Sequence, residues 1–125
     1  METTKVDKSN IVDLNKGMVP PSAVDFEEAV LGAAIIDKQG VDEMMMVLPN
    51  GECFYKEQHK FIFEAIHSLF NEGEPIDLLT VSQRLKRFGK LELAGGDYYL
   101  IQLTQKISSS AHMEYWCRII LQKYI

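Results

Sequence analysis

The sequence lacks several features that would assign it to a class at once. It has no apolar run near the roughly 20 residues that a helix needs to cross a bilayer, and its polar N-terminus has no signal-peptide block. Its two cysteines, Cys53 and Cys117, have 63 residues between them, which fits neither a zinc site nor a redox C-x-x-C motif. We therefore expect a cytoplasmic protein with two reduced, buried thiols.

Basic charge is also scarce, with 13 Lys and Arg against 18 Asp and Glu, for a net charge of −5. This balance argues against a stand-alone domain that binds nucleic-acid phosphates. The charge is uneven, at 0 over 1–19, −9 over 20–79 and +4 over 80–125. Two interpretations stay open: chance, or an acidic and a basic end that meet different neighbours. With 125 residues, 46% of them hydrophobic, the chain is long enough for one soluble domain.

The apolar spacing is helical throughout, and no alternation typical of strands lasts more than a few residues. Residues 1–19 show no period and are expected to form a flexible tail. We predict all-α structure with helices at 23–36, 41–48, 54–71, 78–88, 97–107 and 111–125. Ser22, Asp77 and Asp97 are expected to cap helices, and Gly73 and Gly89 to end them.

The last predicted helix has a single narrow polar stripe of Glu114, Arg118 and Gln122. Apolar residues cover most of its remaining circumference, so we expect it to be buried on several sides. No C-cap residue follows it. We expect its packing partner to lie beyond residue 125 or on another chain.

Sequence motifs of nucleotide-binding and catalytic sites are missing. The sequence has no G-x-x-x-x-G-K-[ST] phosphate loop, no G-x-G-x-x-G and no nucleophile elbow. His59, His67 and His112 have no metal-ligand spacing. Acid pairs such as Glu27-Glu28 lie at helix starts or turns, where we expect them to complement the helix dipole or to remain solvated. We expect no catalytic residue, no cofactor and no metal in this chain.

One helix, at 80–90, is basic and carries Arg84, Lys86, Arg87 and Lys90. An independent DNA-binding domain that uses these residues is one alternative function, and a general all-α adaptor is another. The approach to this helix is acidic, with Glu72, Glu74 and Asp77, and would repel phosphate.

Five motifs, taken in order and spacing, resemble a known family. They are Pro20-Pro21; Glu27-x-x-Val30-Leu31-Gly32 with Asp37; Phe54-Tyr55-x-x-x-His59-x-x-Ile62-Phe63-x-Ala65-Ile66-x-x-Leu69; Pro75-Ile76-Asp77-x-x-Thr80-Val81-x-x-x-Leu85; and Gly95-Gly96-x-x-Tyr99-Leu100-x-x-Leu103. Together they are similar to the N-terminal domain of DnaB-type bacterial replicative helicases, over residues 20–125. Cys53 departs from the pattern, because the family usually has an acid before its Phe-Tyr pair.

The resemblance implies a compact helical head of about five helices at 20–108 and, at 109–125, the first arm of a truncated helical hairpin. It also implies that a RecA-like ATPase domain, which would bind ATP and magnesium, follows after residue 125. Hairpins of this family pair between subunits and build a collar of three dimers on a hexameric helicase.

The implied partners are a second copy of the chain, a DnaG-type primase and a helicase loader, with no membrane and little direct DNA contact. From helix position alone, we expect eight residues of the last helix to form the subunit or primase interface. They are Met113, Tyr115, Trp116, Arg118, Ile119, Ile120, Lys123 and Tyr124.

Overall fold

The computed structural model describes residues 22–107 and 109–124, so the tail predicted at 1–19 lies outside the described residues. The described residues form helices and connecting segments without strands, which confirms the all-α class. In chain order the elements are α1 (Ala23–Ile36), α2 (Lys38–Val47), the 3-10 helix η1 (Gly51–Cys53), α3 (Glu57–Asn71), α4 (Leu78–Arg87), α5 (Gly96–Gln105) and α6 (Met113–Tyr124).

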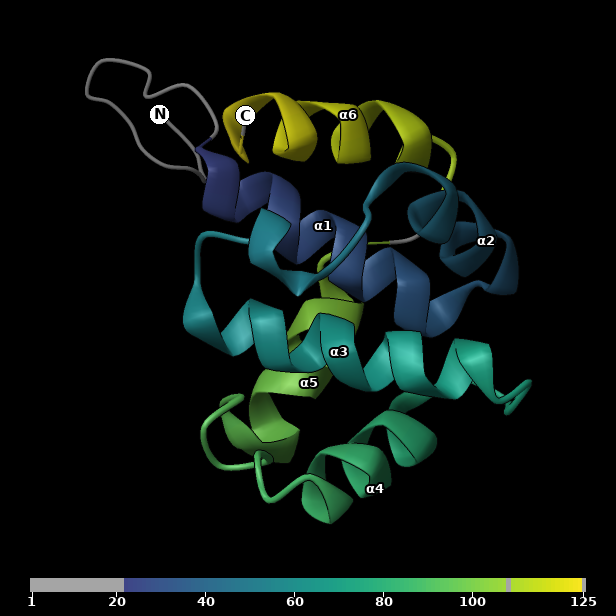
Figure 1. Ribbon diagram of the computed structural model, residues 1–125, viewed down its shortest axis with the longest axis vertical. Coiled ribbons are helices and arrows are strands. Elements are labelled where there is room, and N and C mark those ends of the chain that lie inside the picture. The colour runs from purple at the N-terminus through teal and green to yellow at the C-terminus, as the bar shows by residue number, and fades with distance from the viewer. Residues whose placement is uncertain (1–21, 108, 125) are drawn as a thin grey trace.

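Helix α1 runs through the middle of the molecule, with α6 across one side of it and α3, α5 and α4 on the other (Figure 1). It packs against each of the other five α-helices. Its central residues Val30, Leu31, Ala33 and Ala34 are at most 1% exposed. The small alanine side chains let the surrounding helices approach closely, which makes α1 the centre of the core.

The start of α1 is fixed by the predicted cap. The Ser22 hydroxyl accepts the backbone N–H of Asp25 at 3.4 Å, and the Asp25 carboxylate accepts the backbone N–H of Ser22 at 2.8 Å. This reciprocal pair is a capping box in which Asp replaces the usual Glu.

Helix α2 begins three residues earlier than the sequence predicts. Asp37 ends α1 and also caps α2, because its carboxylate accepts the backbone N–H of Gln39 at 3.0 Å. Gly40 lies between the helices predicted at 23–36 and 41–48, but in the structure it is helical and buried. A Cβ there would lie 3.1 Å from both Met113 Cε and Ser110 Cβ, so Gly40 serves close packing against the start of α6.

Helix α3 begins three residues later than predicted. Phe54 is 1% exposed but extended, and it enters the core ahead of the helix. The predicted stop at Gly73 is confirmed, with φ of 70°, and the N–H of Glu74 donates to the Leu69 carbonyl at 3.0 Å. These are the bonds of a Schellman-type ending.

The connection between α4 and α5 corrects one predicted cap. Asp77 caps α4 in a box with Thr80, as expected. The cap of α5 is Gly95, at φ of 105°, whereas Asp97 lies inside the helix and its carboxylate accepts the Ser82 hydroxyl at 2.6 Å. Asp97 therefore connects α5 to α4 instead of capping its own helix.

Helix α6 closes the core over α1 and α2. Ahead of it, the buried Ser110 hydroxyl donates to the Asp37 carboxylate at 2.5 Å, which ties the entry of α6 to the corner between α1 and α2. The first arm of a hairpin was expected at 109–125. The described residues of this segment pack on the head, and their buried side chains belong to the same core as those of the other helices.

Candidate interaction surface

The inward side of α6 is formed by Met113, Cys117 and Ile120, each at most 1% exposed. Met113 and Ile120 were expected to pair with another subunit. The structure instead buries both against α1 and α2, so neither is accessible to a partner. Some of the apolar side chains of this helix are therefore buried within the domain itself.

Two expected interface residues are half-buried at one edge of α6. Trp116 packs against the core, and its ring lies edge-on to His112 with 6.0 Å between centroids. Ile119, three residues after Trp116, is half-buried on the same edge. Both contribute to the packing of α6 and expose only part of their apolar surface.

The other four expected residues are exposed, and we call Tyr115, Arg118, Lys123 and Tyr124 the α6 surface. Tyr115 is 63% exposed and Tyr124 is 51% exposed. The Arg118 guanidinium pairs with Glu114 one turn away, with 2.6 Å between Nη2 and Oε2. Exposed tyrosines and arginine are the side chains that most often dominate binding energy in protein interfaces.

Two hollows flank the α6 surface. One, of about 410 Å³, lies between Glu43 on α2 and residues Tyr115 and Arg118. The other, of about 310 Å³, lies where Lys123 and Tyr124 face the segment at 52–55. The α6 surface is thus bordered by two hollows that a partner's side chains can fill.

A buried polar network supports the other side of α1, and the sequence did not predict it. Glu27 is 1% exposed, although we expected it to complement the helix dipole or to remain solvated. Its carboxylate accepts the backbone N–H groups of Tyr55 and Lys56, at 2.5 and 3.3 Å, and contacts His59 Nδ1 at 2.7 Å. The sequence did contain an indication of its burial. Glu27 lies three and four residues before Val30 and Leu31, which places it on the same face of the helix as these buried residues.

The network continues from His59, which is fully buried, to Tyr99 on α5, with 2.6 Å between Nε2 and the hydroxyl. Burial, helped by the carboxylates of Glu28 and Glu27, raises the pKa of Tyr99, so its hydroxyl stays protonated beside Nε2. On the other side of the ring, Nδ1 faces the Glu27 carboxylate. The network is fully satisfied and joins α1, α3 and α5.

The described residues give little support for chemistry. Among them, no group of three His, Cys, Asp or Glu side chains is placed to hold a metal. Burial raises the pKa of the Cys117 thiol to about 12 and also raises that of Cys53, which leaves both as protonated, poorly nucleophilic thiols. No helix in the described part of the chain is long and apolar enough to cross a membrane.

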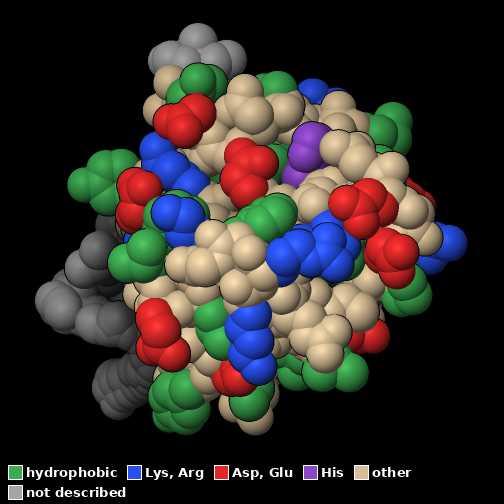
Figure 2. Space-filling model, turned by 60° about the horizontal axis from the view of Figure 1, so that its bottom comes forward, with side chains coloured by type: hydrophobic (Ala, Val, Ile, Leu, Met, Phe, Trp, Pro, Cys, Tyr) green, Lys and Arg blue, Asp and Glu red, His purple; other side chains and the backbone are tan. Residues whose placement is uncertain are grey.

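The basic helix is less available to DNA than its sequence suggests. Arg84 is 5% exposed, and its guanidinium pairs with Glu72 at 2.9 Å. The Lys90 ammonium lies over the Phe61 ring, 5.1 Å from its centroid. Figure 2, which turns the α4 and α5 end toward the viewer, shows Lys and Arg side chains in small separate groups, with apolar and other surface between them and Asp and Glu around them. This face therefore lacks the continuous basic patch that phosphate binding needs.

Comparison with known proteins places the chain in a family. The family model described as the DnaB-like helicase N-terminal domain matches residues 19–122. The chain is 44% identical over 109 residues to the replicative DNA helicase DnaB of Rhodothermus marinus, covering 87% of this chain and 12% of that protein. It is 36% identical over 108 residues to the DnaB of Geobacillus stearothermophilus, covering 86% of this chain and 23% of that protein.

A solved structure agrees with these matches. The crystal structure of the N-terminal domain of DnaB helicase from Mycobacterium tuberculosis superposes with a TM-score of 0.77 at 31% identity, covering 85% of this chain and 76% of that one. The chain thus spans about a quarter or less of the curated helicases that it matches. By sequence and by fold, the chain belongs to the DnaB-like helicase N-terminal domain family.

Proposed function

We propose that this chain is the noncatalytic N-terminal domain of a replicative DNA helicase, and that it supports hexamer assembly and docks a DnaG-type primase. The match to the family over residues 19–122 carries the proposal. The exposed tyrosines and arginine of the α6 surface support it, because they give the domain a place for partners. In this proposal, the chain pairs with a second copy within a collar of three dimers.

The proposal assigns ATP, magnesium and duplex unwinding to a motor domain outside these 125 residues. The sequence has no phosphate-binding loop, which supports a noncatalytic role for this part. The parent protein would act in the cytoplasm at the replication fork, with a helicase loader as a further partner.

Calorimetric titration of the C-terminal domain of a DnaG-type primase into the chain tests the docking role. We expect binding by the wild type and a rise in Kd of about tenfold or more in Tyr115→Ala/Arg118→Ala, because truncated interface tyrosines and arginines commonly cost more than 1 kcal/mol each. Tyr98→Ala on α5 is the matched control, since Tyr98 is 73% exposed and remote from α6 along the chain.

Equal binding by the wild type and the α6 variant would contradict docking at this surface. Hydrolysis of ATP by the purified chain, at a rate that follows the chain through purification, would contradict the noncatalytic role.

A further inference from the structure

The hollow of about 310 Å³ beside Lys123 and Tyr124 adjoins the start of α1. Its lining comes from the beginning of α1, from the segment at 52–55 and from the last turn of α6. Figure 1 shows the start of α1 beside the end of α6. Sites for small ligands measure roughly 300–1,000 Å³, so this hollow suits a short segment with one or two side chains inside it.

Apolar side chains form much of this lining. Phe54 and Ile120, each 1% exposed, reach the hollow from the core. Tyr55 and Tyr124 line its more exposed part, at 82% and 51% exposed. Large apolar surfaces left open to water gain free energy when another apolar group covers them.

The charged side chains around the hollow leave its interior to apolar groups. The Lys60 ammonium pairs with Glu52 at 3.2 Å. The Glu27 carboxylate already accepts the backbone N–H of Tyr55. Lys123 is exposed, and its long side chain can keep the ammonium in water. An apolar side chain, rather than an ion, is therefore the ligand that this lining favours.

Residues 1–21 precede the described part of the chain and join it next to the hollow. The junction is Ser22, directly before Ala23, which lines the hollow. The large apolar side chains nearest to this junction in the sequence are those of Met18 and Val19, followed by Pro20-Pro21. A chain spans at most about 3.3–3.6 Å per residue, so both side chains belong to residues within roughly 14 Å of Ser22. They can therefore reach the hollow.

This covalent link favours Met18 and Val19 over a separate partner. A segment on a short linker acts at an effective concentration that is roughly millimolar, so weak apolar contacts suffice to hold it. The two prolines restrict the linker backbone, which lowers the entropy lost on binding. A second apolar pair, Ile11-Val12, has nine residues between it and Ser22, and a longer loop costs more entropy to close.

We propose that Met18 and Val19 dock in the hollow between the start of α1 and the end of α6. The N-terminal segment of the chain then covers apolar surface of Phe54 and Tyr124. This docking takes place within a single chain, so it does not depend on the function proposed above. Because Tyr124 belongs to the α6 surface, the docked segment would also compete with a partner for that edge, and this consequence alone rests on the proposed function.

NMR spectroscopy of the full chain with ¹³C-labelled Met and Val methyl groups tests the docking. We expect nuclear Overhauser effects between the methyl protons of Met18 or Val19 and the ring protons of Phe54 or Tyr124. The measurement needs no partner protein, so its result is separate from that of the primase titration.

Substitutions in the N-terminal segment test the assignment of the occupant. Met18→Ser/Val19→Ser should shift the backbone amide signal of Tyr55, because its apolar cover is removed. Ile11→Ser/Val12→Ser is the matched control, which makes the same kind of change farther from the junction. We expect the control to leave the Tyr55 signal unchanged.

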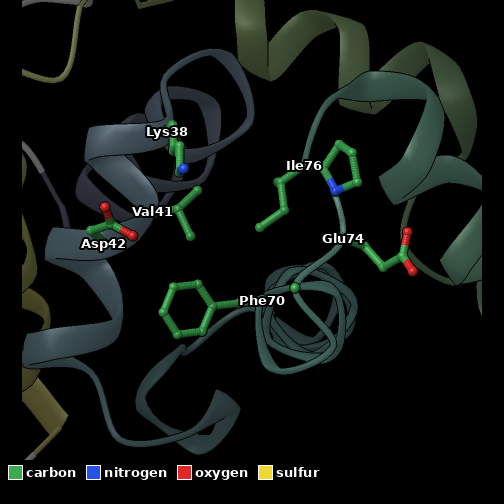
Figure 3. A pocket seen from close by; sticks show the side chains of 8 residues that line it. Lys38, Val41, Asp42, Phe70, Glu74 and Ile76 are labelled. Atoms are coloured by element: carbon green, nitrogen blue, oxygen red, sulfur yellow. The ribbon is translucent and has the colours of Figure 1, made fainter.

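Substitutions in the hollow give the reciprocal test. Tyr124→Ala should shift the methyl signal of Met18. The control is Phe70→Ala, which removes an exposed aromatic side chain at another hollow, between α2 and the end of α3 (Figure 3). No described residue of α1 lines that second hollow, so we expect the Met18 signal to stay where it is.

Three results would overturn the proposal. One is the absence of these nuclear Overhauser effects from the wild type, and another is equal shifts in the paired segment variants. The third is an effect seen only between labelled and unlabelled chains in a mixed sample, which would identify the segment of a second copy as the occupant.

Discussion

The carboxylate of Glu27 accepts three hydrogen bonds inside the core, two from backbone N–H groups and one from His59. A buried carboxylate is tolerated only when such partners replace water. Because Tyr99 completes the chain of contacts, the network fixes how α1, α3 and α5 meet. The network therefore holds these three helices in position, and substitution of its residues tests this role.

Glu27→Gln should lower the free energy of unfolding by about 1–3 kcal/mol, because an amide cannot accept all three donors and buries an unmatched N–H. Urea unfolding followed by circular dichroism measures this. Glu28→Gln is the control, since Glu28 pairs with the exposed Lys106 and should cost less than about 1 kcal/mol. Equal losses in the two variants would show that the buried network adds nothing to stability.

At the scale of elements, α1 and α5 approach closely at Gly32. A Cβ added at Gly32 would overlap the backbone carbonyl of Leu103, so only glycine allows these helices to pack as they do. Gly40 on α2 differs, because its tightest contacts, at 3.1 Å, include the flexible end of Met113.

Gly32→Ala should destabilise the domain by about 2 kcal/mol or more, because two backbones must separate. Gly40→Ala gains about the same helix propensity as Gly32→Ala. Its free energy of unfolding should stay within about 1 kcal/mol of the wild-type value. Thermal unfolding of both variants measures the difference. A Gly32→Ala variant as stable as Gly40→Ala would refute the close contact between α1 and α5.

The elements that local chemistry determines were predictable. Ser22 and Asp77 cap their helices and Gly73 ends one, because capping and positive φ depend on a few neighbouring residues. Gly40 and Asp97 were misplaced because tertiary contacts decide their roles: one packs against α6 and the other accepts a hydrogen bond from α4. Short-range patterns contain no information on such partners.

The candidate surface was only partly predictable for the same reason. Aromatic and apolar residues on the last helix indicated an interface, but only the fold shows which of them face α1. Met113 and Ile120 are therefore buried, while Tyr115 and Tyr124 stay exposed.

Over the whole molecule, folding mixes the charges that the sequence separates. Arg84 and Lys106, from the basic last third, pair with Glu72 and Glu28 from the acidic middle. Acidic and basic ends were one of two interpretations of the sequence, and the charges of such ends are partly neutralised within the domain. Specific surfaces, rather than a global charge polarity, remain available for partners, and the α6 surface is one of them.

Sedimentation equilibrium of the purified chain tests assembly through the α6 surface, because self-association is the first step of the proposed assembly. We expect a reversible dimer for the wild type, and a monomer at the same concentrations for Tyr115→Ala/Tyr124→Ala, with Tyr98→Ala still dimeric. A wild type that stays monomeric at all concentrations, or an α6 variant that dimerises as well as the wild type, would contradict assembly through the α6 surface.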